Sequence, residues 1–261
     1  MRLGIVFVFA LFASACGTAL PPGSFDWGHG AIPLEKGEKR FQFGGGVGGA
    51  VGLVKSDIFG PPLQLATSGW PLPVGLGVGG GSSIELQVTD WMSLRAESSL
   101  GAEWSLVSGL PSAAGAGYLG TQMNFAPNFA ARTRLGLGAA GTSLLYLSTL
   151  NAERLFDNPV AHVEGEAGLV YTFPSPPTEE RWIYTYGNGR AGNAQMPDTG
   201  RFSGFGLFGL GVNLGWSQKM KDDFSFYTSA RADYSTSYYE NGSTFPLASF
   251  AVQVGVTTKG L

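Results

Sequence analysis

The chain has 261 residues, of which only 13% are charged and 41 are glycine, and its formal net charge is -3. Soluble domains have about 25% charged residues and about 7% glycine, so a soluble protein of this composition would be poorly dispersed in water. The small net charge and the lack of a basic stripe exclude a nucleic-acid partner.

Residues 1–15 predict a signal peptide. Arg2 supplies a positive charge, an apolar run covers residues 3–13, and Ala13-Ser14-Ala15 has the small side chains of a cleavage site. The apolar run is shorter than the roughly 20 residues that a membrane-spanning helix needs. We therefore expect the chain to be exported.

Cys16 is the only cysteine, so no intramolecular disulfide can form. Its position after small residues resembles the signal of bacterial lipoproteins, in which such a cysteine is lipidated. That family usually has leucine three positions earlier, where this chain has Ala13. The resemblance implies lipidation of Cys16 and, because Gly17 follows it, sorting to the outer membrane. Ordinary cleavage that leaves a free thiol is the alternative.

Residues 16–38 contain prolines and glycines without periodicity, which predicts an N-terminal linker that includes His29. Residues 39–261 are expected to form one domain, because apolar and polar residues alternate there with the period of a β-strand. The alternation is clear over residues 41–53, 74–88, 94–106, 129–137, 163–173, 208–216, 224–234 and 250–256, and weaker over 116–125 and roughly 143–150.

The expected connections are of two kinds. Residues 89–92, 126–128 and 218–223 are short, whereas 55–71, 109–115, 174–200 and 240–246 are mostly longer. Short periplasmic turns and longer outer loops are typical of transmembrane barrels. Strand directions agree with this rule if a strand lies near 143–150. The sequence thus predicts an all-β fold, an antiparallel up-and-down transmembrane β-barrel of about ten strands, with eight as the alternative.

The apolar face of these strands carries essentially no charge, which favours contact with lipid rather than water. A Lys or Arg there would cost about 2–4 kcal/mol at mid-bilayer. Aromatic residues are expected to form two interfacial girdles. One girdle lies beside the short turns (Phe41, Phe43, Trp91, Phe125, Phe129, Trp216, Phe224) and the other near the opposite ends (Trp104, Tyr171, Phe173, Phe202, Tyr234, Tyr238).

On these features, residues 39–258 resemble the small Gram-negative outer-membrane barrels of the OmpA-like type. The resemblance implies an outer-membrane location with membrane lipid as a partner, and we expect the N-terminus on the periplasmic side. Those barrels usually end in an aromatic residue, whereas this chain ends Lys259-Gly260-Leu261. The departure puts the usual assembly signal in doubt.

The polar face of the strands predicts a charge network in the lumen. A barrel of this size is narrow enough for side chains to fill, and unpaired charges there would be costly, so we expect these residues to pair. A conducting pore is the alternative. The predicted members are Arg40, Glu85, Arg95, Glu97, Glu103, Arg132, Arg134, Glu164, Glu166, Arg231 and Asp233.

Signals for catalysis are thin. His162 and Glu164 share one strand face and could form an acid–base or metal pair, but such a pair more often belongs to an interior polar network. Zinc-ligand spacing is lacking, and the glycine runs 44–49 and 75–81 lack the Lys-Ser/Thr ending of a phosphate loop. We therefore predict no catalytic residue, metal or cofactor.

The expected loop 174–200 is the best candidate for partner binding. It holds Trp182, Tyr184 and Tyr186, followed by a Gly-Asn-Gly sequence at 187–189 that could form a hairpin tip. Exposed aromatic residues on a loop suit recognition of a protein or glycan. The alternative is a loop that packs on its own hairpin.

The sequence favours a non-enzymatic outer-membrane barrel with a structural, adhesive or surface-interaction role. Three alternatives remain open: a narrow porin-like channel, a membrane-embedded lipid-modifying enzyme, and a lipid-anchored soluble ligand-binding β-barrel.

Overall fold

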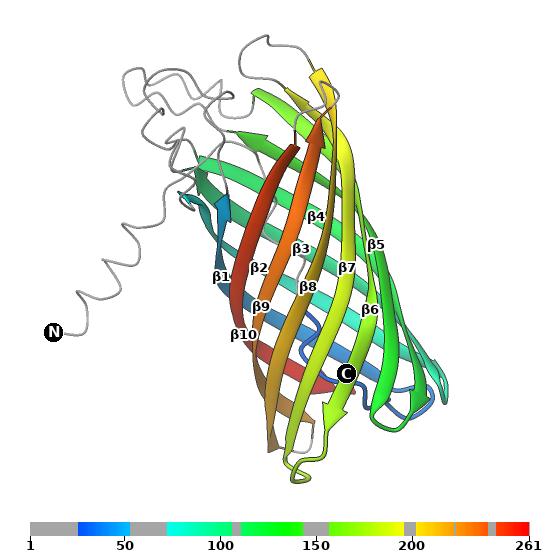
Figure 1. Cartoon of the computed structure of the whole chain (residues 1–261). Coiled ribbons are helices and arrows are strands. Elements are labelled where there is room, and N and C mark those ends of the chain that lie inside the picture. The colour runs from blue at the N-terminus through cyan, green and yellow to red at the C-terminus, as the bar shows by residue number, and fades with distance from the viewer. Residues whose placement is uncertain are drawn as a thin grey trace, which may run out of the picture.

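In a computed structural model of the chain, the described residues are 26–52, 72–105, 111–142, 157–195, 202–221, 223–239 and 244–260. They form ten antiparallel strands, each hydrogen-bonded to the next, and β1 pairs with β10 to close a barrel (Figure 1). The strands are β1 Lys39–Gly52, β2 Leu72–Thr89, β3 Met92–Ser105, β4 Pro111–Ala126, β5 Phe129–Thr142, β6 Asp157–Phe173, β7 Glu179–Gln195, β8 Phe202–Lys221, β9 Phe224–Tyr239 and β10 Thr244–Lys259. The predicted all-β, ten-stranded antiparallel barrel is confirmed. None of the described residues belongs to a helix that is long and apolar enough to cross a membrane.

The alternation in the sequence separates the two faces of the barrel wall. Large apolar side chains point outward, and Leu100, Leu119 and Leu210 are each more than 70% exposed. Polar side chains of the same strands point inward, and Glu85 and Arg132 are at most 2% exposed. The barrel therefore has an apolar outside and a charged, hydrogen-bonded inside.

One strand lies where the sequence predicted a loop. Residues 179–195 form β7, and the predicted hairpin tip at 187–189 is paired on both sides, with β6 and β8. The prediction of a loop over 174–200 is therefore wrong. The predicted strand near 143–150 lies outside the described residues, so the count of ten rests on β7 instead. The sequence did not predict β7 because Trp182, Tyr184 and Tyr186 face inward, so this strand lacks the run of apolar outward-facing residues that marks most of the others.

The two ends of the barrel differ in their connections. Residues 90–91, 127–128, 174–178 and 222–223 join strands at what we call the short-turn end, where β1 also begins and β10 ends. Residues 53–71, 106–110, 143–156, 196–201 and 240–243 join strands at the opposite, long-loop end.

An outward-facing aromatic girdle surrounds the short-turn end, where Trp91, Phe125 and Phe224 are exposed. Tyr171 and Phe173 also lie at this end, in edge-to-face contact, because residues 174–178 form a short turn. The sequence had placed these two residues at the opposite end, which is wrong. Of the girdle predicted there, Tyr234 is exposed, whereas the side chains of Trp104, Phe202 and Tyr238 lie outside the described residues.

Inward-facing glycines make room for large side chains on the neighbouring strand. A Cβ at Gly215 in β8 would lie well inside van der Waals contact of the buried Trp182 ring in β7. At Gly211, the same holds for the Tyr186 ring. These glycines let the rings lie along the wall.

We expect Gly215→Ala to destabilise the barrel by about 1–3 kcal/mol, because overpacking forces a buried ring to move. Gly187→Ala is the matched control in the adjoining strand, since the nearest atoms to its added Cβ lie 3.8 Å away. The temperature at which the folded band converts on SDS gels measures both variants. Equal conversion temperatures for Gly215→Ala and the unsubstituted chain would contradict this account.

Candidate functional site: the plugged lumen

A segment that precedes β1 fills the lumen at the short-turn end (Figure 1). Residues 26–31 and Leu34 are buried, and we call residues 26–34 the plug. The sequence indicated a linker over 16–38, but the described part of it packs inside the barrel. It lacks periodicity because it belongs to no strand, and residues 16–25 lie outside the described part.

The plug is bound by every strand of the barrel. Main-chain N–H groups of the plug donate to wall side chains, for example from Gly28 to Gln42 Oε1 (3.0 Å) and from Ala31 to Thr172 Oγ1 (2.6 Å). Wall side chains donate in turn to plug oxygens, as from Ser229 to Asp26 Oδ2 (2.9 Å). The wall partners from β1 to β10 are Gln42, Glu85, Arg95, Gln122, Arg132, Thr172, Glu180, Asn213, Ser229 and Gln253.

Trp27 of the plug is in contact with two guanidinium groups of the wall. The Cζ atoms of Arg95 and Arg132 are each 4.5 Å from the centroid of its ring. The Arg132 Nη2 atom also donates to the carbonyl oxygens of His29 (2.8 Å) and Gly30 (2.6 Å). Stacking and hydrogen bonding therefore act together to hold the plug against β3 and β5.

His29 connects the plug to the predicted charge network. Its Nε2 atom lies 2.8 Å from Glu85 Oε2, and its Nδ1 atom lies 3.3 Å from Arg132 Nη2. The Nδ1 atom also lies 2.8 Å from the Gly30 carbonyl oxygen, so the ring is enclosed by polar groups of the plug, β2 and β5.

The predicted lumen charges are brought together across the barrel. Arg134 bridges Glu97 (3.3 Å) and Glu166 (2.7 Å), and Arg231 reaches the same Glu166 (3.1 Å). Arg231 also contacts Asp26 of the plug (3.5 Å). The remaining pairs are Arg95–Glu97, Arg40–Glu85 and Arg231–Asp233. Almost no water reaches these groups, so the pairs tie β3, β5, β6, β9 and the plug into one unit.

Two predicted charges have partners other than those expected, and a third lies outside the described side chains. Arg132 binds plug carbonyls and Gln122 rather than a carboxylate. Glu164 pairs with Arg190 (2.8 Å), which sequence reasoning missed because it assigned residue 190 to a loop. The side chain of Glu103 lies outside the described residues.

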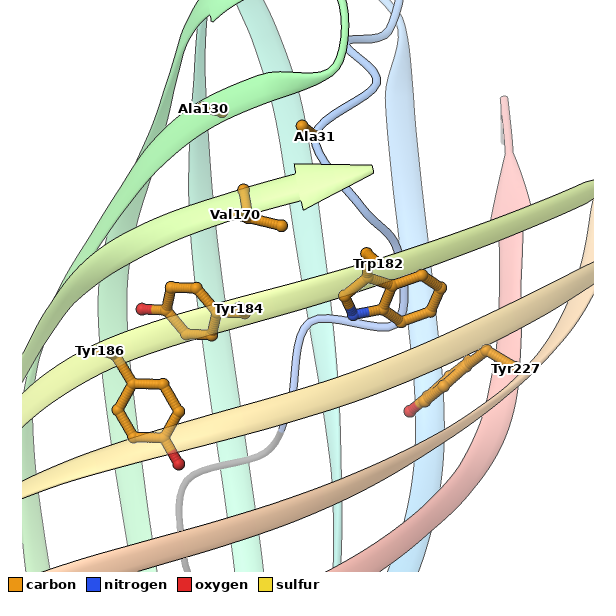
Figure 2. Close-up of a cluster of buried hydrophobic side chains, with 7 residues drawn as sticks. All are labelled: Ala31, Ala130, Val170, Trp182, Tyr184, Tyr186 and Tyr227. Atoms are coloured by element: carbon orange, nitrogen blue, oxygen red, sulfur yellow. The ribbon is translucent and has the colours of Figure 1, made fainter. Parts of the chain in front are cut away.

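The three aromatic residues proposed for partner binding face the lumen. Trp182, Tyr184 and Tyr186 are at most 4% exposed and lie in a row along β7 (Figure 2). The Tyr184 hydroxyl donates to Glu166 (2.9 Å), and the Tyr186 hydroxyl donates to Asp233 (2.6 Å). The prediction that they form an exposed recognition loop is wrong, and they instead complete the lumen network.

His162 and Glu164 also face the lumen and are buried. Among the described residues, no three His, Cys, Asp or Glu side chains are grouped so that they could hold a metal ion. Sequence reasoning missed Gln42 and Asn213, which bind the plug, and Asp26 of the plug itself, which accepts from Asn213. These residues could be assigned only once the position of the plug was known.

No protein-family model matches the chain, and no curated protein matches it. Solved barrels similar to it include the outer membrane protease OmpT of Escherichia coli, at 10% identity over 87% of this chain and 97% of that chain, with a TM-score of 0.43. The translocator domain of the autotransporter NalP of Neisseria meningitidis has 10% identity over 87% of this chain and 90% of that domain, with a TM-score of 0.43. The attachment invasion locus protein Ail of Yersinia pestis has 9% identity over 86% of this chain and 99% of that protein, with a TM-score of 0.31. All three are bacterial outer-membrane barrels, and likeness at this level concerns the fold alone.

Proposed function

We propose that the chain is an integral outer-membrane barrel that its own plug keeps closed, and that it acts as a membrane-embedded scaffold with a structural, adhesive or surface-interaction role. The observation that carries this proposal is the binding of the plug by all ten strands. A barrel sealed in this way presents its outer loops to the outside without conducting ions. Any protein or glycan partner would meet those loops, which lie outside the described residues.

The outer surface supports a membrane location. A band of exposed apolar side chains, among them Leu135, Leu137 and Phe208, covers the middle of the strands. Among the described residues, the exposed charged side chains all lie at or near the short-turn end: Glu35, Lys36, Lys39, Asp90, Arg181, Lys219, Lys221, Asp223 and Lys259. Charges are thus kept away from the band, as contact with lipid requires.

The other readings of the sequence fit this geometry less well. A soluble ligand-binding barrel needs its apolar face inside, but here that face is outside. An enzyme acting on membrane lipid needs a polar residue such as His162 directed toward the bilayer, but His162 is 4% exposed and faces the lumen. A porin-like channel needs the plug to leave the lumen.

The first test is fractionation of the full chain expressed in a Gram-negative host. We expect a carbonate-resistant outer-membrane band whose mobility on SDS gels changes on boiling. In planar bilayers, the purified protein should insert and remain closed. Release by carbonate would overturn the membrane proposal, and sustained current through the unsubstituted chain would overturn the closed state.

A further inference from the structure

The plug runs in a defined direction through the lumen. Residues 35–38 lie at the short-turn end, where the Gly37 N–H donates to the Gln87 carbonyl (2.9 Å). Going backward along the chain from Ala31 to Asp26, the main-chain N–H groups of the plug donate to wall side chains that lie progressively farther from that end. The wall partners are Thr172 for Ala31, one residue before the end of β6, then Gln42 for Gly28, three residues into β1, then Gln253 for Asp26, six residues before the end of β10.

Asp26 is the deepest described residue of the plug. Its partner Gln253 lies six residues before the end of β10. With a rise of about 3.3 Å per residue and a strand tilt of about 40°, this places Asp26 roughly 15 Å above the short-turn end. The partners of its carboxylate lie at a similar level, since Ser229 is five residues into β9 and Asn213 eight residues before the end of β8. Its carbonyl oxygen, on the side of the plug nearer the short-turn end, accepts from Gln42 and Arg95, each three residues into its strand. The chain before Asp26 therefore starts from deep within the lumen.

If the chain before Asp26 returned to the short-turn end, it would have to pass the plug itself. Trp27 and Ala31 are 2% and 0% exposed, and all ten strands are bonded to residues 26–34. A second length of chain could pass this level only by breaking these bonds and displacing Arg95 or Arg132 from the Trp27 ring. A chain that continues toward the long-loop end breaks none of these bonds.

We propose that the chain before Asp26 leaves the barrel at its long-loop end, so that the mature N-terminus is presented on the cell surface. The proposal rests on the proposed membrane orientation, with long loops outside. About 25 Å of wall remains above Ser229 on β9, whereas the ten residues from position 16 to position 26 can extend about 33–36 Å. Cys16 can therefore lie beyond the rim. In the proposed arrangement, the barrel displays its own N-terminus on the cell surface. The periplasmic N-terminus expected from the sequence is the competing arrangement.

Substituted cysteines distinguish these two arrangements. Thr18→Cys probes the N-terminal segment, Asp90→Cys probes the short-turn end, and Asn241→Cys probes the long-loop end. Each variant is treated with a membrane-impermeant maleimide on intact cells and again after the outer membrane has been permeabilised, with the denatured chain as the reference for complete labelling. The unsubstituted chain measures any reaction of Cys16 itself, and the heat-shifted band shows that each variant folds.

We expect Thr18→Cys to follow Asn241→Cys and be labelled on intact cells, whereas Asp90→Cys reacts only after permeabilisation. A Thr18→Cys thiol that follows Asp90→Cys overturns the proposal, and so does one that is unlabelled under both conditions, because residue 18 then lies inside the lumen. If the two reference positions exchange their behaviour, the proposed membrane orientation fails. In that case, a Thr18→Cys thiol that still follows Asn241→Cys supports the route through the lumen.

Discussion

Deletion of residues 26–34 is expected to convert a closed barrel into an ion-conducting one. Only side chains of the wall would then remain at this level, including Arg95 and Arg132, which now stack on Trp27. The sequence predicted that wall side chains would fill the lumen, but the plug occupies part of it. A ten-stranded barrel is wider than the eight-stranded kind that side chains just fill, so water and small ions should enter once the plug is removed. In planar bilayers we expect sustained current from this variant, whereas the unsubstituted chain remains closed.

The matched control is deletion of residues 17–25, which removes the same length of chain and leaves the plug in place. This variant should remain closed. Both deletions must still give a heat-shifted band, so that conduction is measured on folded barrels. If the barrel lacking residues 26–34 folds and remains closed, the plug does not seal the lumen, and the proposed function loses the observation that carries it.

The barrel could be predicted from sequence because lipid imposes a simple rule on the wall. Apolar residues that face lipid, such as Leu100 and Leu135, stand at every second position of a strand. This period-two alternation locates most of the strands. In β7 the aromatic residues face inward, and its outward positions include Arg181 and Thr185. A rule that seeks an apolar outer face fails at such a strand, and the Gly-Asn-Gly sequence inside it was mistaken for a turn.

The plug could not be predicted because its contacts are long-range and individually ordinary. Asp26 bonds to Gln253, which is 227 positions away, and Gly30 bonds to Glu180 through a main-chain N–H. Neither contact has a local sequence pattern. The charges of the lumen could be listed from the alternation, but their pairing depends on strand register. Arg190 entered the network only when β7 was known to be a strand.

Glu166→Gln is expected to destabilise the folded barrel by about 3–5 kcal/mol, the usual result of removing one partner from a buried charge cluster. The carboxylate of Glu166 accepts hydrogen bonds from Arg134 (2.7 Å) and Tyr184 (2.9 Å), and it pairs with Arg231 (3.1 Å). An amide carries no negative charge, so two buried guanidinium groups would lose their shared counter-ion. Guanidinium-induced unfolding in detergent micelles measures the loss.

Glu179→Gln provides the same chemical change in an exposed ion pair. Glu179 contacts Arg181 at 2.7 Å, but the Arg181 side chain is 58% exposed and water can replace the lost charge. We expect no measurable change in stability for this variant. Equal losses for the two variants would mean that burial of the network does not decide its energetic importance. If Glu166→Gln alone is destabilised, the cross-lumen charges hold the wall together around the plug.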